Sequence, residues 1–238
     1  MAITVAAFGA LNNDSYDVFA KRLAHYAEAE GVSISLISAQ PYPNARAESE
    51  PGRPLRSEAL QDEAKKQQLF DAVAGDAKKI GALRSDILAM PCMSMIGFHE
   101  GVEKALGRHI VRLADALAAK YKDVDKVGVI HMRPAKKRIE EIFGAKAVTA
   151  TDRQAGSLLK AEEKSRAEGS PHAVYFAMQE IVESWRDHGI TQVLFARADA
   201  PKAHLSSAGM VENMVINNYF DILAEAVIAQ AKELRKPS

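Results

Sequence analysis

The chain has 238 residues, of which 47% are hydrophobic and 26% charged, a composition typical of a globular protein with a substantial core. Its 31 basic and 31 acidic residues balance, and no apolar stretch approaches the roughly 20 residues that span a bilayer. These features argue against nucleic acid or a membrane as partner and leave a small molecule as the default. The single cysteine, Cys92, excludes an internal disulfide and a cysteine-only metal site, and favours the cytoplasm as compartment.

The first half of the chain predicts strands that alternate with helices. Three short apolar runs indicate buried strands: residues 3–8, 32–38 and 86–90. No basic segment precedes the first run, so it is expected to be a strand and not a signal peptide. Helices are expected in three segments: residues 16–30, 57–80 and 98–106. The prolines between residues 40 and 54 predict an irregular loop there.

The same order restarts near residue 126. Further strands are expected at residues 126–131, 145–150 and 191–196, and further helices at residues 135–143, 173–188 and 210–234. This alternation predicts an α/β fold in which helices flank parallel sheets. We expect two similar lobes, related by a pseudo-two-fold axis, with the active site in the cleft between them. The N-terminal lobe would comprise residues 1–113 plus the closing segment 209–238, and the C-terminal lobe residues 114–208.

Ligands of open α/β sheets bind beyond the carboxyl ends of the strands, so a binding site is expected there. Those ends are predicted at four positions: residues 9–13, 90–94, 131–133 and 196–199. Cys92 follows the strand at residues 86–90 directly, where a nearby helix start would favour its thiolate form. Ser94 and the backbone amides after Cys92 could bind a carboxylate. A buried structural cysteine is the alternative, because free cysteine packs like a small hydrophobic residue.

Two segments of the first half resemble the aspartate racemases of the aspartate/glutamate racemase superfamily. In the stretch MPCMSMIGFHEGVEKALGRHIVRLADAL, Cys92, Ser94 and Asp115 match the family's cysteine, hydroxyl residue and aspartate. The stretch FGALNNDSYDVF resembles the glycine-rich first loop, with Gly9 and Ser15 aligned.

The second half carries the resemblance in KVGVIHM, which is similar to the family's next strand, and in TQVLFARADAP. The latter resembles the segment of the second cysteine, with Asp199 and Pro201 in place. Arg197 stands where the family has that cysteine, and Met93 stands where an asparagine follows the first one.

The resemblance implies an isomerase that needs no metal or organic cofactor and commonly forms a homodimer. In such enzymes one thiol removes the α-proton of a small amino acid or dicarboxylate, and a second thiol returns a proton to the opposite face. The sequence itself also predicts no metal or organic cofactor, because it has no ligand cluster or phosphate-binding loop.

The replacement of the second cysteine changes the expected roles. Arginine stays charged beyond about pH 12, so Arg197 cannot act as a base near neutral pH but could bind a substrate carboxylate through a bidentate pair. His131 ends a predicted strand of the second half, and histidine titrates in the range that a second base requires. A histidine satisfied by loop backbone is the competing interpretation. His99, in the helix after Cys92, is expected to be a helix-face residue.

Other residues are candidates for substrate binding. The family holds a distal carboxylate with an arginine from the proline-rich loop, where Arg46, Arg53 and Arg56 lie, and supplies a lysine in the region of Lys160 and Lys164. With Cys92 and His131 as candidate catalytic residues, the predicted substrate-binding set is Gly9, Asn12, Ser94, Arg53, Arg197 and Asp199.

Two other functions stay open. A decarboxylase or a cis–trans isomerase of the same superfamily is one, because protonation of a single face of a carbanion needs a single thiol. A carboxylate-binding protein that has lost catalysis is the other, because the second cysteine and the asparagine after Cys92 are both missing.

Overall fold

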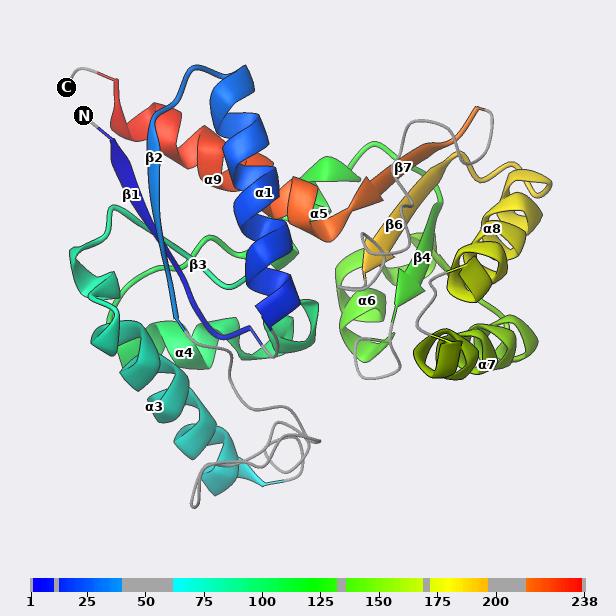
Figure 1. The fold of residues 1–238 in the computed structure, drawn as a ribbon, viewed down its shortest axis with the longest axis horizontal. Coiled ribbons are helices and arrows are strands. Elements are labelled where there is room, and N and C mark those ends of the chain that lie inside the picture. The colour runs from blue at the N-terminus through cyan, green and yellow to red at the C-terminus, as the bar shows by residue number, and fades with distance from the viewer. Residues whose placement is uncertain are drawn as a thin grey trace. The chain divides into compact units, whose positions relative to one another are not determined.

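The computed structural model describes residues 2–10, 13–39, 62–131, 136–168, 172–196 and 213–236. The chain divides into two compact units, Met1–Ala116 with Phe220–Ser238 and Leu117–Tyr219 (Figure 1). Within the described ranges, none of the helices has the length and apolar character needed to cross a membrane.

The first unit is built on a three-stranded parallel sheet. Its strands are β1 (Ile3–Ala7), β2 (Ile34–Ser38) and β3 (Ile87–Ala89), in the order β2-β1-β3. The central strand β1 is almost fully buried, as a strand covered on both faces requires, and this explains its continuous apolar sequence ITVAA. The side chain of Asp86 accepts the Thr4 amide at 2.8 Å and so fixes the start of β3 against β1.

Helices pack around this sheet. They are α1 (Asn13–Ala29), α3 (Glu63–Lys79), α4 (His99–Leu106) and α9 (Tyr219–Leu234), while α5 (Leu113–Lys120) crosses the boundary between the two units. Helix α1 lies beside α9 in Figure 1, and an Arg22–Asp221 ion pair of 3.2 Å joins them. Helices α3 and α4 approach closely at Gly101, where a β-carbon would lie 2.2 Å from the ring of Phe70.

The second unit contains a four-stranded parallel sheet. Its strands are β4 (Val127–His131), β5 (Ala147–Thr149), β6 (Gln192–Ala196) and β7 (Val215–Asn218), in the order β5-β4-β6-β7. Its helices are α6 (Lys136–Phe143), α7 (Asp152–Glu168) and α8 (His172–Arg186), of which α7 and α8 lie side by side (Figure 1). The ring of Trp185 from α8 covers β4 at Gly128, where a β-carbon would be only 2.3 Å away.

The predicted α/β class with two parallel sheets flanked by helices is confirmed. The helix predicted at residues 210–234 is wrong at its start, because residues 215–218 pair with β6 as strand β7 and the helix begins only at Tyr219. Helices α5 and α7 had not been predicted. The pseudo-two-fold relation and the cleft between the lobes stay predictions.

Candidate active site

The loops after β1 and β3 meet at one edge of the first sheet. The two strands are parallel neighbours with Ala7 opposite Ala89, and the Phe8 amide extends the ladder by donating to the Ala89 carbonyl at 3.1 Å. The residues that follow each strand therefore lie close together, which brings the Gly9 turn to the segment that carries Cys92.

Gly9 is required by the close approach of these two loops. Its φ of +74° lies in the left-handed region that side-chain-bearing residues avoid. A β-carbon at Gly9 would lie 2.8 Å from the Cε of Met90, two residues before Cys92. Gly9 thus supports the backbone of the site, and its predicted contact with substrate stays a prediction.

Cys92 lies where the sequence placed it, just beyond β3. Its backbone is extended, with its amide donating to the Met90 carbonyl at 2.8 Å and its carbonyl accepting the Met95 amide at 3.0 Å. A short 3-10 helix, Met93–Phe98, follows, and the side chain of Cys92 is 5% exposed. Met90, Met93 and Met95 are buried as well, whereas Ser94 is partly exposed.

Tyr16, in the first turn of α1, reaches back to the turn that follows β1. Its buried hydroxyl accepts the Ala10 amide at 3.1 Å. Burial, reinforced by the nearby negative charges of Cys92 and Asp76, raises the pKa of Tyr16 above its ordinary value and keeps the phenol protonated. Tyr16 could not be singled out from the sequence, because an aromatic residue at the start of a helix is usually a core residue.

His99, the first residue of α4, is fully inside the first unit. Its side chain is 3% exposed, and neither ring nitrogen has a hydrogen-bond partner. Burial lowers the pKa of His99 to about 4, an effect that Glu103 opposes and Arg112 reinforces. His99 lies on helix α4, as predicted, but its ring faces the interior and is neutral near pH 7.

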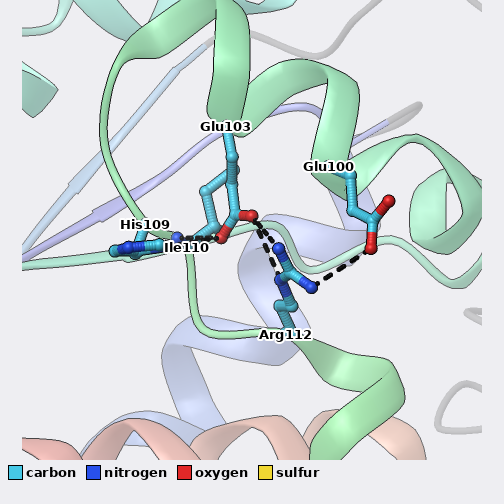
Figure 2. A network of polar contacts seen from close by, with 5 residues as sticks. All are labelled: Glu100, Glu103, His109, Ile110 and Arg112. Atoms are coloured by element: carbon cyan, nitrogen blue, oxygen red, sulfur yellow. Dashed lines mark hydrogen bonds and ion pairs between the residues drawn. The ribbon is translucent and has the colours of Figure 1, made fainter.

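A polar network lies one helical turn beyond His99 (Figure 2). The buried carboxylate of Glu103 accepts the Ile110 amide at 2.8 Å and pairs with the guanidinium of Arg112, whose Nε lies 3.1 Å from it. Arg112 also contacts the exposed Glu100 at 3.3 Å. Burial alone would raise the pKa of Glu103, but the bonds from Arg112 and Ile110 outweigh it and hold that pKa below its usual value.

The same network borders a shallow open pocket of about 360 Å³, which Ala226 and Gln230 of α9 complete. Asp115, which the resemblance aligned with the family's aspartate, lies in the first turn of α5 and lines this pocket together with Glu103 and Arg112. Among the residues that the structure describes, no three histidine, cysteine or acidic side chains are arranged to hold a metal ion.

In the second unit, His131 is the last residue of β4 and is partly exposed. It pairs in register with Ala196, the residue before Arg197. Lys160 and Lys164 are exposed on α7, where Lys164 lies 3.9 Å from Glu168.

Several predicted binding residues fall outside the described residues. They are Asn12, Arg53, Arg197 and Asp199, together with Arg46 and Arg56, the other two arginines of the proline-rich loop. Their contacts with substrate, like those of Ser94, stay predictions.

No protein-family model matches the sequence, and no protein of curated function matches it. Solved structures do match over nearly the whole chain. An aspartate racemase homologue from Pyrococcus horikoshii has 16% sequence identity and a TM-score of 0.71, covering 98% of this chain and 100% of that one. The aspartate racemase of Picrophilus torridus has 14% identity and a TM-score of 0.61, covering 97% and 95%. A glutamate racemase from Francisella tularensis, solved with D-glutamate, has 13% identity and a TM-score of 0.60, covering 98% and 82%. The chain therefore has the fold of the aspartate and glutamate racemases.

Proposed function

We propose that the protein is a cofactor-independent racemase-like isomerase that transfers a proton on a small amino acid or dicarboxylate, with the thiol of Cys92 as one acid–base group. The observation that carries the proposal is the position of Cys92. The chain's single thiol follows β3 at the edge where the β1 loop arrives, in a fold shared with racemases over nearly the whole chain.

The reaction requires two groups. The Cys92 thiolate takes the α-proton, and the electron pair left behind is delocalised into the substrate carboxylate as a carbanion. A second acid then gives a proton to the opposite face and inverts the centre, and the reverse reaction exchanges the two roles. We assign the second role to His131, because histidine, unlike arginine, exchanges protons near neutral pH.

Arg197 would bind the substrate carboxylate through a bidentate pair. The guanidinium would also favour loss of the α-proton, since it stabilises the negative charge that moves onto the carboxylate. Gly9, Asn12 and Ser94 would line the α-carboxylate side, and Arg53 and Asp199 would contact the rest of the substrate.

The proposal is tested by incubating the purified protein with L-aspartate, L-glutamate and the other L-amino acids in deuterated water. Proton NMR detects loss of the α-proton signal, and chiral chromatography detects the D-enantiomer. We expect exchange with at least one amino acid, and loss of that exchange in Cys92→Ala. Absence of exchange for every amino acid would refute racemisation.

Two histidine variants test the role of His131. His131→Gln should slow inversion at least tenfold, since positioned acid–base groups typically contribute a hundredfold or more. His188→Gln, at an exposed histidine of the same unit, should leave the rate unchanged. Equal rates for the two variants would remove His131 from the mechanism.

The presence of a single thiol favours one alternative, a decarboxylase or a cis–trans isomerase that protonates only one face of its intermediate. Carbon dioxide released from substituted malonates by the wild type, but not by Cys92→Ala, would support a decarboxylase. Binding of dicarboxylates without any turnover would instead indicate a carboxylate-binding protein.

A further inference from the structure

The segment that carries Cys92, residues 90–98, joins strand β3 to helix α4. The chain returns beside β3 at Val111, which pairs with Ala89 as a parallel bridge and donates its amide to the Leu88 carbonyl at 2.8 Å. Val111 therefore supports β3 on the side away from β1, at the point where the Cys92 segment leaves the strand.

Glu103 ties the other end of the Cys92 segment to the same stretch of chain (Figure 2). It lies on α4, one turn beyond the start of the helix, and one oxygen of its carboxylate accepts the Ile110 amide at 2.8 Å. The other oxygen accepts hydrogen bonds from Arg112, from Nε at 3.1 Å and from Nη2. Ile110 and Arg112 flank Val111, so the bonds of Glu103 and of Val111 close the Cys92 segment into a ring.

The stretch that closes this ring is itself anchored. Arg108 precedes it and donates from Nη1 to the carbonyls of Leu83 and Ser85, both at 2.8 Å. Those carbonyls lie before the start of β3, whereas Val111 contacts its end. Residues 108–112 are therefore fixed against β3 at both ends, and a bond from α4 to them restrains the Cys92 segment.

The burial of Glu103 makes its contacts specific. Its side chain is 8% exposed, and within the described part of the chain it is the only acidic side chain that is buried. A buried carboxylate is tolerated only where hydrogen bonds and an opposite charge replace its hydration, and Ile110 and Arg112 supply both. Glu100, by contrast, is 84% exposed where it meets Arg112, and a pair of this kind contributes little.

We infer that Glu103 is a positioning residue for Cys92, which closes the ring by binding Ile110 and Arg112 and so holds the thiol at the end of β3. The inference rests on the proposed function only for the role of Cys92 as an acid–base group. Proton transfer needs reacting atoms within about 3–3.5 Å of each other, so a displaced thiol lowers the rate even where the fold is intact.

The test measures how often the Cys92 segment opens. Cys92 is buried and is the only cysteine of the chain, so iodoacetamide labels a single site at a rate set by opening of the structure around it. Opening of the segment alone exposes little surface, and its rate therefore depends weakly on urea. Opening by global unfolding depends on urea as steeply as unfolding itself.

Two variants loosen the ring. Glu103→Ala removes the bonds to Ile110 and Arg112, and should raise the labelling rate without urea by about tenfold or more, with a weak dependence on urea. Arg112→Lys keeps the charge but cannot reproduce the paired bonds of Nε and Nη2, and should give a smaller increase of the same kind. Arg112→Lys also keeps the inference testable if Glu103→Ala does not fold.

Two other variants serve as controls. Glu100→Gln removes only the exposed contact of Arg112 and should be labelled at the wild-type rate. Leu23→Ala opens a cavity at the buried face of α1 and destabilises the fold, but it leaves the ring intact. Any increase in the labelling of Leu23→Ala should therefore carry the full urea dependence of unfolding.

Labelling of Glu103→Ala and Arg112→Lys at the rate of Glu100→Gln would overturn the inference, and so would an acceleration with the urea dependence of unfolding. The labelling needs no substrate, so it decides the inference even if no amino acid is exchanged. Where the wild type exchanges an α-proton, Glu103→Ala should lose about tenfold or more in kcat at a little-changed KM, and Leu23→Ala should not. Exchange with an unaffected kcat in both ring variants would reject the role of Glu103 and leave the proposed function standing.

Discussion

His99 should make the protein sensitive to mild acid, and His99→Leu should remove that sensitivity. Burial lowers the pKa of the folded-state imidazole to about 4, whereas an unfolded histidine titrates near about 6.5. Neither nitrogen has a partner that would stabilise the added charge. Leucine fills a similar volume without polar atoms, so it should be tolerated at this buried position.

The sign and size of the effect follow from proton linkage. The folded pKa lies below the unfolded one, so the unfolded chain binds more protons between about pH 4 and 6.5, and stability falls as the pH drops through that window. Between pH 7 and pH 5, the His99 contribution should cost roughly 2 kcal/mol of unfolding free energy. Near pH 7 the ring is neutral in both states, and the linkage contribution there is small.

Urea unfolding, followed by far-ultraviolet circular dichroism at pH 7, 6 and 5, measures this contribution. The wild type should lose roughly 2 kcal/mol more than His99→Leu between pH 7 and pH 5. His25→Leu, at an exposed position of α1, controls for the loss of a histidine as such and should follow the wild type. Parallel pH profiles for the wild type and His99→Leu would refute the reasoning, because they would mean that the ring is solvated or partnered in solution.

Two further predictions concern the packing of each unit. Glu103→Gln should destabilise the protein by about 1–3 kcal/mol at pH 7, against less than about 0.5 kcal/mol for the exposed Glu100→Gln. Because the pKa of Glu103 is lowered on folding, its stabilisation is present above the unfolded pKa of about 4.3 and is lost as the pH falls through the lower folded pKa. Urea midpoints measured over a series of acidic pH values test this. Gly128→Ala should displace the ring of Trp185 at a cost of about 1–3 kcal/mol and change the fluorescence of this single tryptophan. Gly156→Ala, which meets no atom within 4 Å on α7, should instead stabilise by about 0.5–1 kcal/mol and leave the emission unchanged.

Strand β1 could be predicted from its composition, whereas strand β7 and helix α7 could not. The run ITVAA of β1 is buried on both faces, so its composition alone identifies it. Strand β7 has the sequence VINN at the edge of its sheet, with Val215 exposed, and its short apolar part merges with the helix that follows. Helix α7 is mostly polar, because one side of it packs on α8 and the rest faces water. Such a helix lacks the apolar stripe on which a prediction from periodicity depends.

In the candidate site, too, some features could be predicted from the sequence and others could not. The place of Cys92 followed from a rule of topology, because residues after neighbouring parallel strands gather at one edge. The burial and hydrogen-bond partners of Tyr16 and His99 depend on which way each side chain points from the first turn of its helix, and on which atoms lie around it. Tyr16 accepts a bond from the Ala10 amide, and the imidazole of His99 has no partner. In the sequence alone, both residues are indistinguishable from ordinary core residues. These properties arise from tertiary packing and cannot be read from the local sequence.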